Sequence, residues 1–399
     1  MKKSSTKDPV KYAKKYYYKR LAQMLFIFIA FFFVVNLIVP SRDFSSVENR
    51  TLQKRPGLSI RDMNTGKYYE DFASYYSDQF VFRDSFRKLT FNAENLFGRR
   101  EFDGVYVGSG GYLLSTPTEP DVPAVKGTVD SLNRFSENYK DLDLYIGIVP
   151  GASSVLSDCL PGGVSLRDQR EDIKEIYSRI DDNIMKVDMA EALTGHADED
   201  IYYKTDHHWT SYGAYLAFQA FADDADLEET EYNVYPVTKS FNGTLSSRTG
   251  DYKHSDTIEI YTPVEEINYY VTYTDSGEES ASIYVSAKLK ENDKYQVFFG
   301  GNHPQVDIKT TVNNEKRILI FKDSYANCYI QFLLPYYEEI IMIDPRYYYG
   351  NVDTIIKTKN ITDVMFLYSA DTILADKSLS STINAVFEDN SEVKLEDEP

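Results

Sequence analysis

The stretch "RILIFKDSYANCYIQFLLPYYEEIIMIDP" (residues 317–345) decides the fold. It begins and ends with apolar runs that have the composition of buried strands, and the segment between them predicts a helix. The same kind of apolar run recurs in "LDLYIGIVP" (142–150) and in "DVMFLYS" (363–369). Apolar strands separated by helices are typical of a parallel sheet covered on both faces. The sequence therefore predicts an α/β sandwich with a mostly parallel sheet.

Residues from about 228 to 312 break this alternation. The segments "DTIEIYTP", "INYYVTYTD", "ASIYVSAKL" and "KYQVFFGGN" are rich in Tyr, Val, Thr and Ile, and they predict strands of an antiparallel β insertion. The insertion falls within a domain that we expect to cover residues 101–399. Residues 41–100 are expected to form a linker followed by N-terminal helices.

The N-terminus predicts a membrane anchor. Residues 1–20 hold eight Lys or Arg and one Asp, and residues 21–40 carry no formal charge. At about 1.5 Å per residue, the apolar run just spans a hydrocarbon core of about 30 Å. A cleaved signal peptide is the alternative, but no A-x-A-like cleavage site follows. The positive-inside rule places the basic tail in the cytoplasm and the large domain outside the cell.

Charge and cysteine content limit the partners. After the tail, the chain carries a formal charge of −26, which argues against binding nucleic acid or an anionic lipid surface. Neutral or basic ligands remain compatible with this charge. The two cysteines, Cys159 and Cys328, either form one disulfide or stay as two free thiols.

The motif "TDHHWT" (205–210) has the spacing of a catalytic pair. In an extended backbone, side chains two residues apart project to the same side, so Asp206 can orient the imidazole of His208. His207 would then point away. A histidine oriented by an aspartate acts as a base for a hydroxyl or thiol nucleophile.

Ser324 is the best candidate for that nucleophile. It stands where an apolar strand turns into a helix, an edge where α/β sheets bind ligands and where backbone N–H groups can face an oxyanion. Gly300, Gly301 and Asn302 add candidate oxyanion or substrate-binding groups, and Arg346 follows the next strand on the same edge. Each residue also has a purely structural interpretation as a helix cap, a turn or a solvated charge.

A metal site is the competing interpretation of the histidine pair. Asp206, His207 and His208 could be joined by His254 or His303. Adjacent histidines face opposite sides of an extended chain, and no H-E-x-x-H or Cys/His spacing is present. We therefore predict neither a metal nor another cofactor.

The segments "TDHHWTSYGAY", "FGGNHP" and "FKDSYAN" together resemble the bacterial DHHW family, which is similar to the SGNH-hydrolase-like domains of the alginate O-acetylation proteins AlgJ and AlgX. The resemblance implies a three-layer sandwich and a D-x-H pair followed by a serine, which map onto Asp206, His208 and Ser324. It also implies acetyl transfer or removal on a cell-surface polysaccharide, often together with a membrane-bound O-acyltransferase as acetyl donor.

Three hypotheses follow from the sequence. The first is a membrane-anchored, extracellular O-acetyltransferase of a cell-envelope glycan. The second is a carbohydrate acetylesterase that uses the same residues with water as acceptor. The third is a non-catalytic surface protein on an SGNH-like scaffold, since a fold does not dictate its function.

Overall fold

The computed structural model describes residues 9–45, 48 and 50–396. The first eight residues of the predicted cytoplasmic tail lie outside this range. The chain forms two compact units, Met1–Ala93 and Glu94–Pro399.

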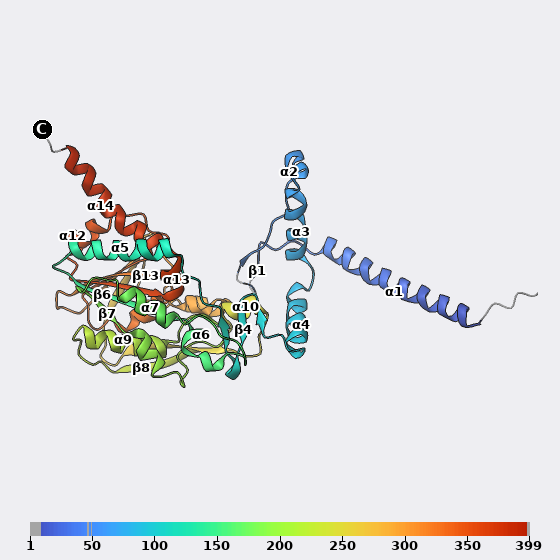
Figure 1. Ribbon diagram of the computed structural model, residues 1–399, viewed down its shortest axis with the longest axis horizontal. Helices are drawn as coiled ribbons and strands as arrows, with labels where there is room; N and C mark the ends of the chain where they lie inside the picture. Colours follow the sequence, from blue (N-terminus) through green and yellow to red (C-terminus); the bar gives the residue numbers. More distant parts are fainter. Residues whose placement is uncertain (1–8, 46–47, 49, 397–399) are drawn as a thin grey trace, which may run out of the picture. The chain divides into compact units, whose positions relative to one another are not determined.

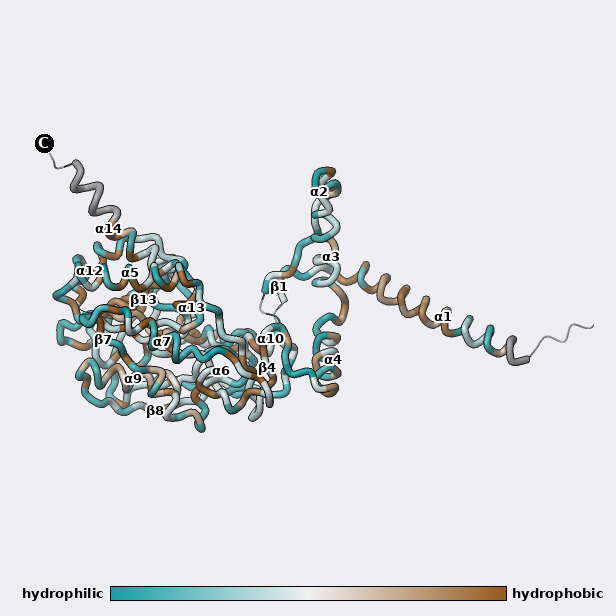
Figure 2. The backbone as a smooth tube through the Cα atoms, in the orientation of Figure 1, coloured by the Kyte–Doolittle hydropathy of each residue, from teal (hydrophilic) through white to brown (hydrophobic). Residues whose placement is uncertain are grey.

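The first unit is helical. The long helix α1 (Pro9–Ile38) contains a stretch, Ala13–Ile38, that is long and apolar enough to cross a membrane. Figure 2 shows its hydrophobic colour along most of its length. The rest of the unit consists of a short strand pair and three helices: β1 (Phe44–Ser45), β2 (Arg50–Thr51), α2 (Ile60–Thr65), α3 (Lys67–Gln79) and α4 (Arg83–Leu96).

The second unit is built on an eight-stranded sheet. Its strands lie in the order β11 (Glu278–Ser280), β10 (Tyr269–Tyr273), β12 (Gln305–Thr310), β14 (Glu339–Ile343), β13 (Arg317–Lys322), β15 (Asp363–Ser369), β6 (Asp143–Val149) and β7 (Ile184–Val187). The five strands from β14 to β7 are parallel, whereas β12, β10 and β11 extend the sheet in antiparallel fashion. The prediction of a mostly parallel sheet is confirmed.

Helices cover both faces of this sheet (Figure 1). One layer contains α5 (Val122–Asn138), α7 (Gln169–Tyr177), α12 (Val352–Lys359), α13 (Ala370–Ala375) and α14 (Ser378–Glu396), and the other contains α8 (Met189–Thr194), α9 (Ser211–Asp224) and α11 (Ala326–Tyr329). Strand β13 shows why two layers are needed, because Leu319 and Phe321 pack into one core cluster while Ile318 and Ile320 pack into the other. The predicted three-layer sandwich is confirmed.

Smaller elements surround the sheet. They are a three-stranded sheet of β3 (Glu101–Phe102), β4 (Val105–Val107) and β5 (Leu113–Ser115), a hairpin of β8 (Tyr232–Phe241) and β9 (Asp256–Pro263), and the short helices α6 (Ala152–Val155) and α10 (Thr244–Thr249). Helix α10 lies in the connection between β8 and β9, which brings its first residue to the candidate active site.

The prediction of four strands in the β insertion is wrong for two of them. Residues 281–289 and 294–302 form an isolated bridge, Tyr284 with Phe298, and 3₁₀ turns at Ser286–Lys290 and Lys294–Val297. The reason is that core contacts here do not follow a period of two, since residues 297, 298 and 299 are all buried in succession. In addition, β10, β11 and β12 lengthen the main sheet.

The two cysteines are free thiols. Cys328 is buried, and burial raises its pKa to about 12, so it behaves as a core residue and not as a nucleophile. The disulfide alternative is therefore not what the structure shows.

Candidate active site

The loop that carries Asp206 and His208 is closed at its base. Tyr202 and Trp209 form an antiparallel bridge, and the N–H of Tyr203 donates to the carbonyl of His208 at 3.2 Å. These backbone contacts turn the "DHH" segment into a short, tightly held loop.

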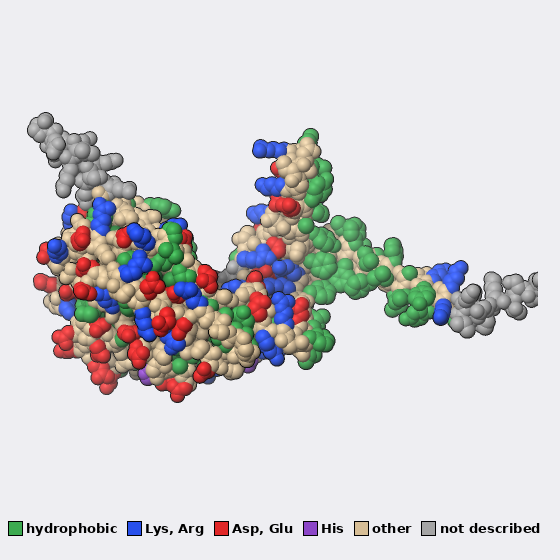
Figure 3. Space-filling model, in the orientation of Figure 1, with side chains coloured by type: hydrophobic (Ala, Val, Ile, Leu, Met, Phe, Trp, Pro, Cys, Tyr) green, Lys and Arg blue, Asp and Glu red, His purple; other side chains and the backbone are tan. Residues whose placement is uncertain are grey.

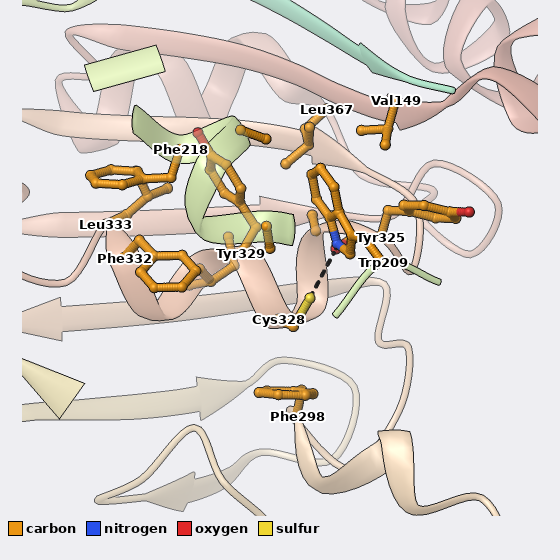
Figure 4. Close-up of a cluster of buried hydrophobic side chains, with 14 of the residues drawn as sticks. Val149, Trp209, Phe218, Phe298, Tyr325, Cys328, Tyr329, Phe332, Leu333 and Leu367 are labelled. Atoms are coloured by element: carbon orange, nitrogen blue, oxygen red, sulfur yellow. Dashed lines mark hydrogen bonds between the residues drawn. The ribbon is translucent and has the colours of Figure 1, made fainter. Parts of the chain in front are cut away.

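Trp209 joins this loop to the turn that carries the candidate nucleophile. Its indole is fully buried, and its Nε1–H donates to the carbonyl of Tyr325 at 3.0 Å. The ring also stacks on Tyr329 with an interplanar angle of 12°. Figure 4 shows the indole among these core side chains. The tryptophan next to the histidines thus anchors the loop and has no direct contact with the reacting groups in this arrangement.

Ser324 lies just beyond the carboxyl end of β13. The preceding residue, Asp323, holds this turn, because one oxygen accepts the Tyr325 N–H at 2.9 Å. Its other oxygen accepts the N–H and the hydroxyl of Ser369 at 2.9 and 2.6 Å, and the hydroxyl of Thr372 at 2.7 Å. The turn is therefore tied to the end of β15 and the start of α13.

Asp206, His208 and Ser324 form a chain of two short hydrogen bonds. His208 Nδ1 lies 2.6 Å from Asp206 Oδ1, and His208 Nε2 lies 2.8 Å from Ser324 Oγ. The aspartate and histidine side chains are only 2% and 7% exposed. This is the geometry in which an aspartate orients an imidazole and the imidazole receives the proton of a serine hydroxyl.

The second oxygen of Asp206 is also fully engaged. Oδ2 accepts the N–H and the hydroxyl of Thr244 at 2.7 and 3.0 Å. Burial on its own would raise the pKa of Asp206, but His207, His208 and the hydrogen bonds outweigh burial and hold the pKa well below its usual range. The carboxylate therefore stays ionised and accepts a hydrogen bond from Nδ1–H of His208. The unprotonated Nε2 then faces Ser324.

Gly243 makes this contact with Thr244 possible. A Cβ at position 243 would lie 2.2 Å from the Cβ of Asp206 and 2.3 Å from its Oδ2. Real side chains do not approach that closely, so a larger residue at 243 would displace the aspartate.

The expectation that His207 points away is wrong. Its Nδ1 lies 2.8 Å from the hydroxyl of Thr244 and 3.4 Å from Asp206 Oδ1, and its ring centroid is 3.9 Å from that of His208. The reason is that residues 204–208 form bends and not an extended strand, so neighbouring side chains do not alternate. Desolvation in this crowded site, followed by the nearby His208, lowers the pKa of His207 to about 4, so its ring is neutral at pH 7.

The same three residues are the candidate metal ligands. One ligand atom each from Asp206, His207 and His208 lie within 4.8 Å of one another. However, both oxygens of the aspartate and Nδ1 of each histidine already hydrogen-bond within the site. The donor set fits a proton relay better than a cation, which would have to break these bonds.

The ring of Tyr295 stacks on the imidazole of His208. The two rings stack with centroids 4.0 Å apart and an angle of 14°, and the Tyr295 hydroxyl donates to the carbonyl of Ser324 at 3.0 Å. The tyrosine therefore fixes both the plane of the base and the backbone of the candidate nucleophile.

Asn302 lies at the same sheet edge, in contact with a buried lysine. Its Oδ1 accepts from Asn327 Nδ2 at 3.1 Å and from Lys322 Nζ at 3.4 Å, and Nζ also donates to Asn327 Oδ1 at 2.6 Å. Lys322 is 1% exposed, and burial lowers its pKa to about 8. These contacts hold the Oδ1 end of the Asn302 amide, and among the described residues its NH₂ group has no hydrogen-bond acceptor.

The glycine pair before Asn302 forms a tight turn. Phe299, Gly300 and Gly301 have φ values of 63°, 78° and 131°, a backbone that favours glycine. The N–H of Gly300 donates to the carbonyl of Gln296 at 2.9 Å, so it is already used within the turn. The structure thus brings Asn302, but not the amide of Gly300, into the hydrogen-bond network that adjoins Ser324.

Arg346 follows β14 on the same edge and is held by Asp344. Its Nε and Nη2 donate to the two oxygens of this buried carboxylate at 2.8 and 2.6 Å. The guanidinium remains 29% exposed, and its charge contributes to the lowered pKa of Lys322.

Thr244, Tyr295 and Lys322 were not identified from the sequence. Thr244 and Tyr295 lie 38 residues after Asp206 and 29 before Ser324, and no local pattern marks either one. Lys322 did carry a signal, because it continues the core-facing positions of β13 and is a charged residue among buried apolar ones.

The mostly parallel α/β sandwich, with Ser324, His208 and Asp206 at its carboxyl edge, matches the SGNH-hydrolase-like fold expected from the sequence. Residues 130–343 match the family model described as "DHHW protein". Because this match covers more than half of the chain, the chain belongs to the DHHW family.

The chain is also similar to solved structures. A DHHW family protein from Eubacterium siraeum is 27% identical, with a TM-score of 0.63, over 71% of this chain and 96% of that chain. Bacillus cereus PatB1, solved with a sulfonyl adduct, is 19% identical with a TM-score of 0.58, over 69% and 96%. The O-acetyltransferase domain of Pseudomonas putida AlgJ is 15% identical with a TM-score of 0.42, over 71% and 99%. No curated protein sequence matches the chain.

Proposed function

We propose that this chain is a membrane-anchored, extracellular enzyme that transfers an acetyl group to a hydroxyl of a cell-surface polysaccharide. The observation that carries the proposal is the pair of hydrogen bonds, 2.6 and 2.8 Å long, that link Asp206, His208 and Ser324. The sulfonyl adduct of PatB1 supports it, because sulfonyl reagents commonly form adducts with activated hydroxyl groups.

The reaction would proceed in two halves. Ser324 Oγ attacks the carbonyl carbon of an acetyl donor while His208 Nε2 takes the hydroxyl proton, and that proton then passes to the leaving group of the donor. An acetyl ester of Ser324 results. A sugar hydroxyl next attacks this ester, gives its proton to His208 Nε2, and leaves as the acetylated sugar while the proton returns to Ser324 Oγ. Asp206 stays ionised throughout and stabilises the imidazolium.

Asn302 is the proposed donor to the oxyanion of both tetrahedral intermediates, with Gly301 beside it. Lys322 and Asn327 act as positioning residues, because they hold the carbonyl end of the Asn302 amide. Arg346 would contact the substrate, since Asp344 holds its guanidinium while part of it stays exposed.

The acceptor is proposed to be a neutral or cationic glycan. Residues 101–399 carry 24 Lys or Arg and 53 Asp or Glu, a formal charge of −29, which repels a strongly anionic polymer. The donor would be supplied by a membrane-bound O-acyltransferase.

The test of the chemistry is the substitution Ser324→Ala in the full-length chain in detergent. We expect the wild type to release p-nitrophenol from p-nitrophenyl acetate and to form a single adduct with phenylmethylsulfonyl fluoride, detected by intact mass. Ser324→Ala should lose both signals, whereas Ser255→Ala, a change at an exposed serine, should retain them. Adduct formation that persists in Ser324→Ala would exclude this serine as the nucleophile.

The acceptor separates a transferase from an esterase. With an oligosaccharide added, a transferase should convert acetyl ester into acetylated sugar at the expense of free acetate. Acetate as the sole product at saturating sugar would favour the esterase, and absence of both activities with no adduct would favour the scaffold hypothesis.

The topology is proposed from the charge asymmetry around α1. Protease added to intact cells should digest the chain beyond residue 41 and spare an epitope placed at the N-terminus. Protection of the large domain would overturn the extracellular location.

A further inference from the structure

Helices α3 and α4 each expose one apolar stripe. On α3, Tyr69, Phe72 and Tyr76 recur at intervals of three and four residues, and on α4 Phe86 and Leu89 are three residues apart. Phe82, in the turn just before α4, is exposed as well. Their exposed fractions range from 39% for Phe72 to 64% for Leu89. Side chains at this spacing lie on one face of a helix.

An ion-pair cluster joins the same helices to the segment before them, since Asp78 lies on α3 and Arg83 and Arg87 lie on α4. Glu48 contacts Arg50 at 2.8 Å and Arg87 at 3.1 Å and also contacts Arg83, and Asp78 contacts Arg50 at 2.6 Å. The two carboxylate side chains are only 8% and 11% exposed. In this unit one ion-pair cluster is shielded while large apolar side chains are exposed, an exposure that water does not favour.

The exposed stripes are continuous with α1. The ring of Phe32 on α1 lies 5.6 Å from that of Phe80 and 5.9 Å from that of Phe86, and Asn36 Oδ1 accepts the N–H of Val81 at 2.9 Å. Figure 3 shows apolar side chains along α1 and on the side of α2, α3 and α4 nearest to it, with charged side chains on the other side.

The contact with Phe32 indicates how deep in the membrane the turn between α3 and α4 lies. Phe32 lies six residues before Ile38, the end of α1, which corresponds to about 9 Å along the helix axis. A helix lying in the membrane interface buries its apolar face by about 5–10 Å. If α1 spans the bilayer, the turn between α3 and α4 therefore reaches the boundary between lipid headgroups and acyl chains.

Charge also distinguishes this part of the chain. Residues 41–100 hold 11 Lys or Arg and 8 Asp or Glu, a formal charge of +3. The charge of −26 on the chain after the tail, which argued against a lipid surface, includes this positively charged segment. A weakly basic segment is compatible with anionic headgroups.

We infer that α3 and α4 lie in the outer interface of the bilayer that α1 spans, with their apolar stripes in contact with phospholipid. We call this pair of helices, residues 67–96, the interfacial foot. The inference rests on the membrane anchor proposed above and assigns a second lipid contact to the chain. The aromatic residues of the foot suit this position, because tyrosine and other aromatic rings favour the membrane interface.

The test uses the full-length chain in lipid vesicles with one fluorescent NBD probe at a time, in a background with Cys159→Ser. Probes are placed on the stripes by Tyr76→Cys and Leu89→Cys, and on the opposite faces by Ser74→Cys and Lys88→Cys as matched controls. Nitroxide-labelled phospholipid serves as the quencher. We expect stripe probes to be blue-shifted and quenched several-fold more than their controls.

Two outcomes would overturn the inference. Equal quenching on the two faces would mean that the apolar stripes of the interfacial foot are exposed to water and not to lipid. Stripe probes that are shielded from both water and the nitroxide-labelled lipid would mean that protein covers the stripes, either a second copy of this chain or a partner. A probe at Phe26→Cys, in the middle of α1, tests the anchor separately. If that probe is quenched while the stripe probes are not, the foot fails and the anchor stands, whereas loss of quenching at Phe26→Cys contradicts the anchor itself.

Discussion

The two units of this chain differ in where their large apolar side chains lie. The second unit packs apolar residues on both faces of its sheet and keeps a formal charge of −29 over residues 101–399. The N-terminal unit buries an ion-pair cluster around Glu48 and Asp78 and exposes Phe, Tyr and Leu. Apolar burial stabilises a domain in water, at roughly 25 cal/mol per Å², and this term favours the first arrangement but not the second. The comparison teaches that the two units are built for different surroundings.

The proposed functions divide in the same way. Changes in the second unit should alter turnover of a soluble ester without altering membrane retention, and changes in the N-terminal unit should do the reverse. The predictions below test this separation.

Replacing the base should have the largest effect. We expect His208→Ala to lower turnover of p-nitrophenyl acetate by about 10³-fold or more, because members of a triad act as a unit. His207→Ala should lower it by about tenfold or less, since this ring contacts Asp206 but has no hydrogen bond to Ser324 in the structure. Both variants should remain in the membrane fraction to the same extent as the wild type. Equal losses from the two histidines would favour the metal interpretation.

The next effect concerns the approach of the backbone to Asp206. Gly243→Ala adds a Cβ at 2.2 Å from the aspartate, so the carboxylate must shift away from His208. A misplacement of about 1 Å at a catalytic group can cost about 100-fold, and we expect a loss of kcat between tenfold and that value. Gly162→Ala is the matched control, because a Cβ there meets nothing within 4 Å. Unchanged kcat in Gly243→Ala would show that the position of Asp206 is not limiting.

The sequence predicts the fold of the second unit better than it predicts the residues of the candidate active site. The sheet can be predicted because its strands, such as β13, are continuous apolar runs. The "DHHW" motif and Ser324 can be predicted because aspartate, histidine and serine are residue types used in nucleophilic catalysis. Tyr295 was missed because its segment was taken for a strand, although its contacts come from a 3₁₀ turn packed over His208. Thr244 was missed because only the hairpin of β8 and β9 brings it to Asp206. In both cases, tertiary packing determines the position and local pattern does not.

The N-terminal unit illustrates the opposite limit. The sequence predicts helices in this part of the chain, but it does not reveal whether their apolar face packs on protein or on lipid. Only the shielded ion pairs at Glu48 and the contact of Phe32 with Phe86 indicate which face of these helices is turned toward lipid.

A third prediction concerns stability and pH. Burial lowers the pKa of Lys322 from 10.5 to about 8, so between these values the unfolded chain binds more protons than the folded chain. Stability should therefore rise with pH across this window, by about 3 kcal/mol for this group at the order of magnitude given by 1.36 kcal/mol per pKa unit. In Lys322→Met the rise should be missing. Denaturant unfolding of both proteins at pH 7.5, 9 and 10.5 measures the difference, and parallel curves would contradict a lysine that is neutralised in the folded state. The groups that influence it are Asp344, Arg346 and Asp323.

The smallest effect on catalysis should come from the ion-pair cluster of the N-terminal unit. Asp78→Asn removes the charge that bonds Arg50 at 2.6 Å and the acceptor charge for the N–H of Gln53 at 2.8 Å. Turnover of p-nitrophenyl acetate should stay within about twofold of wild type, because surface and remote changes usually act weakly on an independent unit. Limited proteolysis in detergent should nevertheless cut the segment between residues 41 and 96 faster, since Arg50 loses the charge of Asp78 and keeps that of Glu48. Asp71→Asn on the same helix is the control and should leave the digestion rate unchanged. A loss of turnover in Asp78→Asn alone would show that the two units communicate, and it would end the separation on which the other predictions depend.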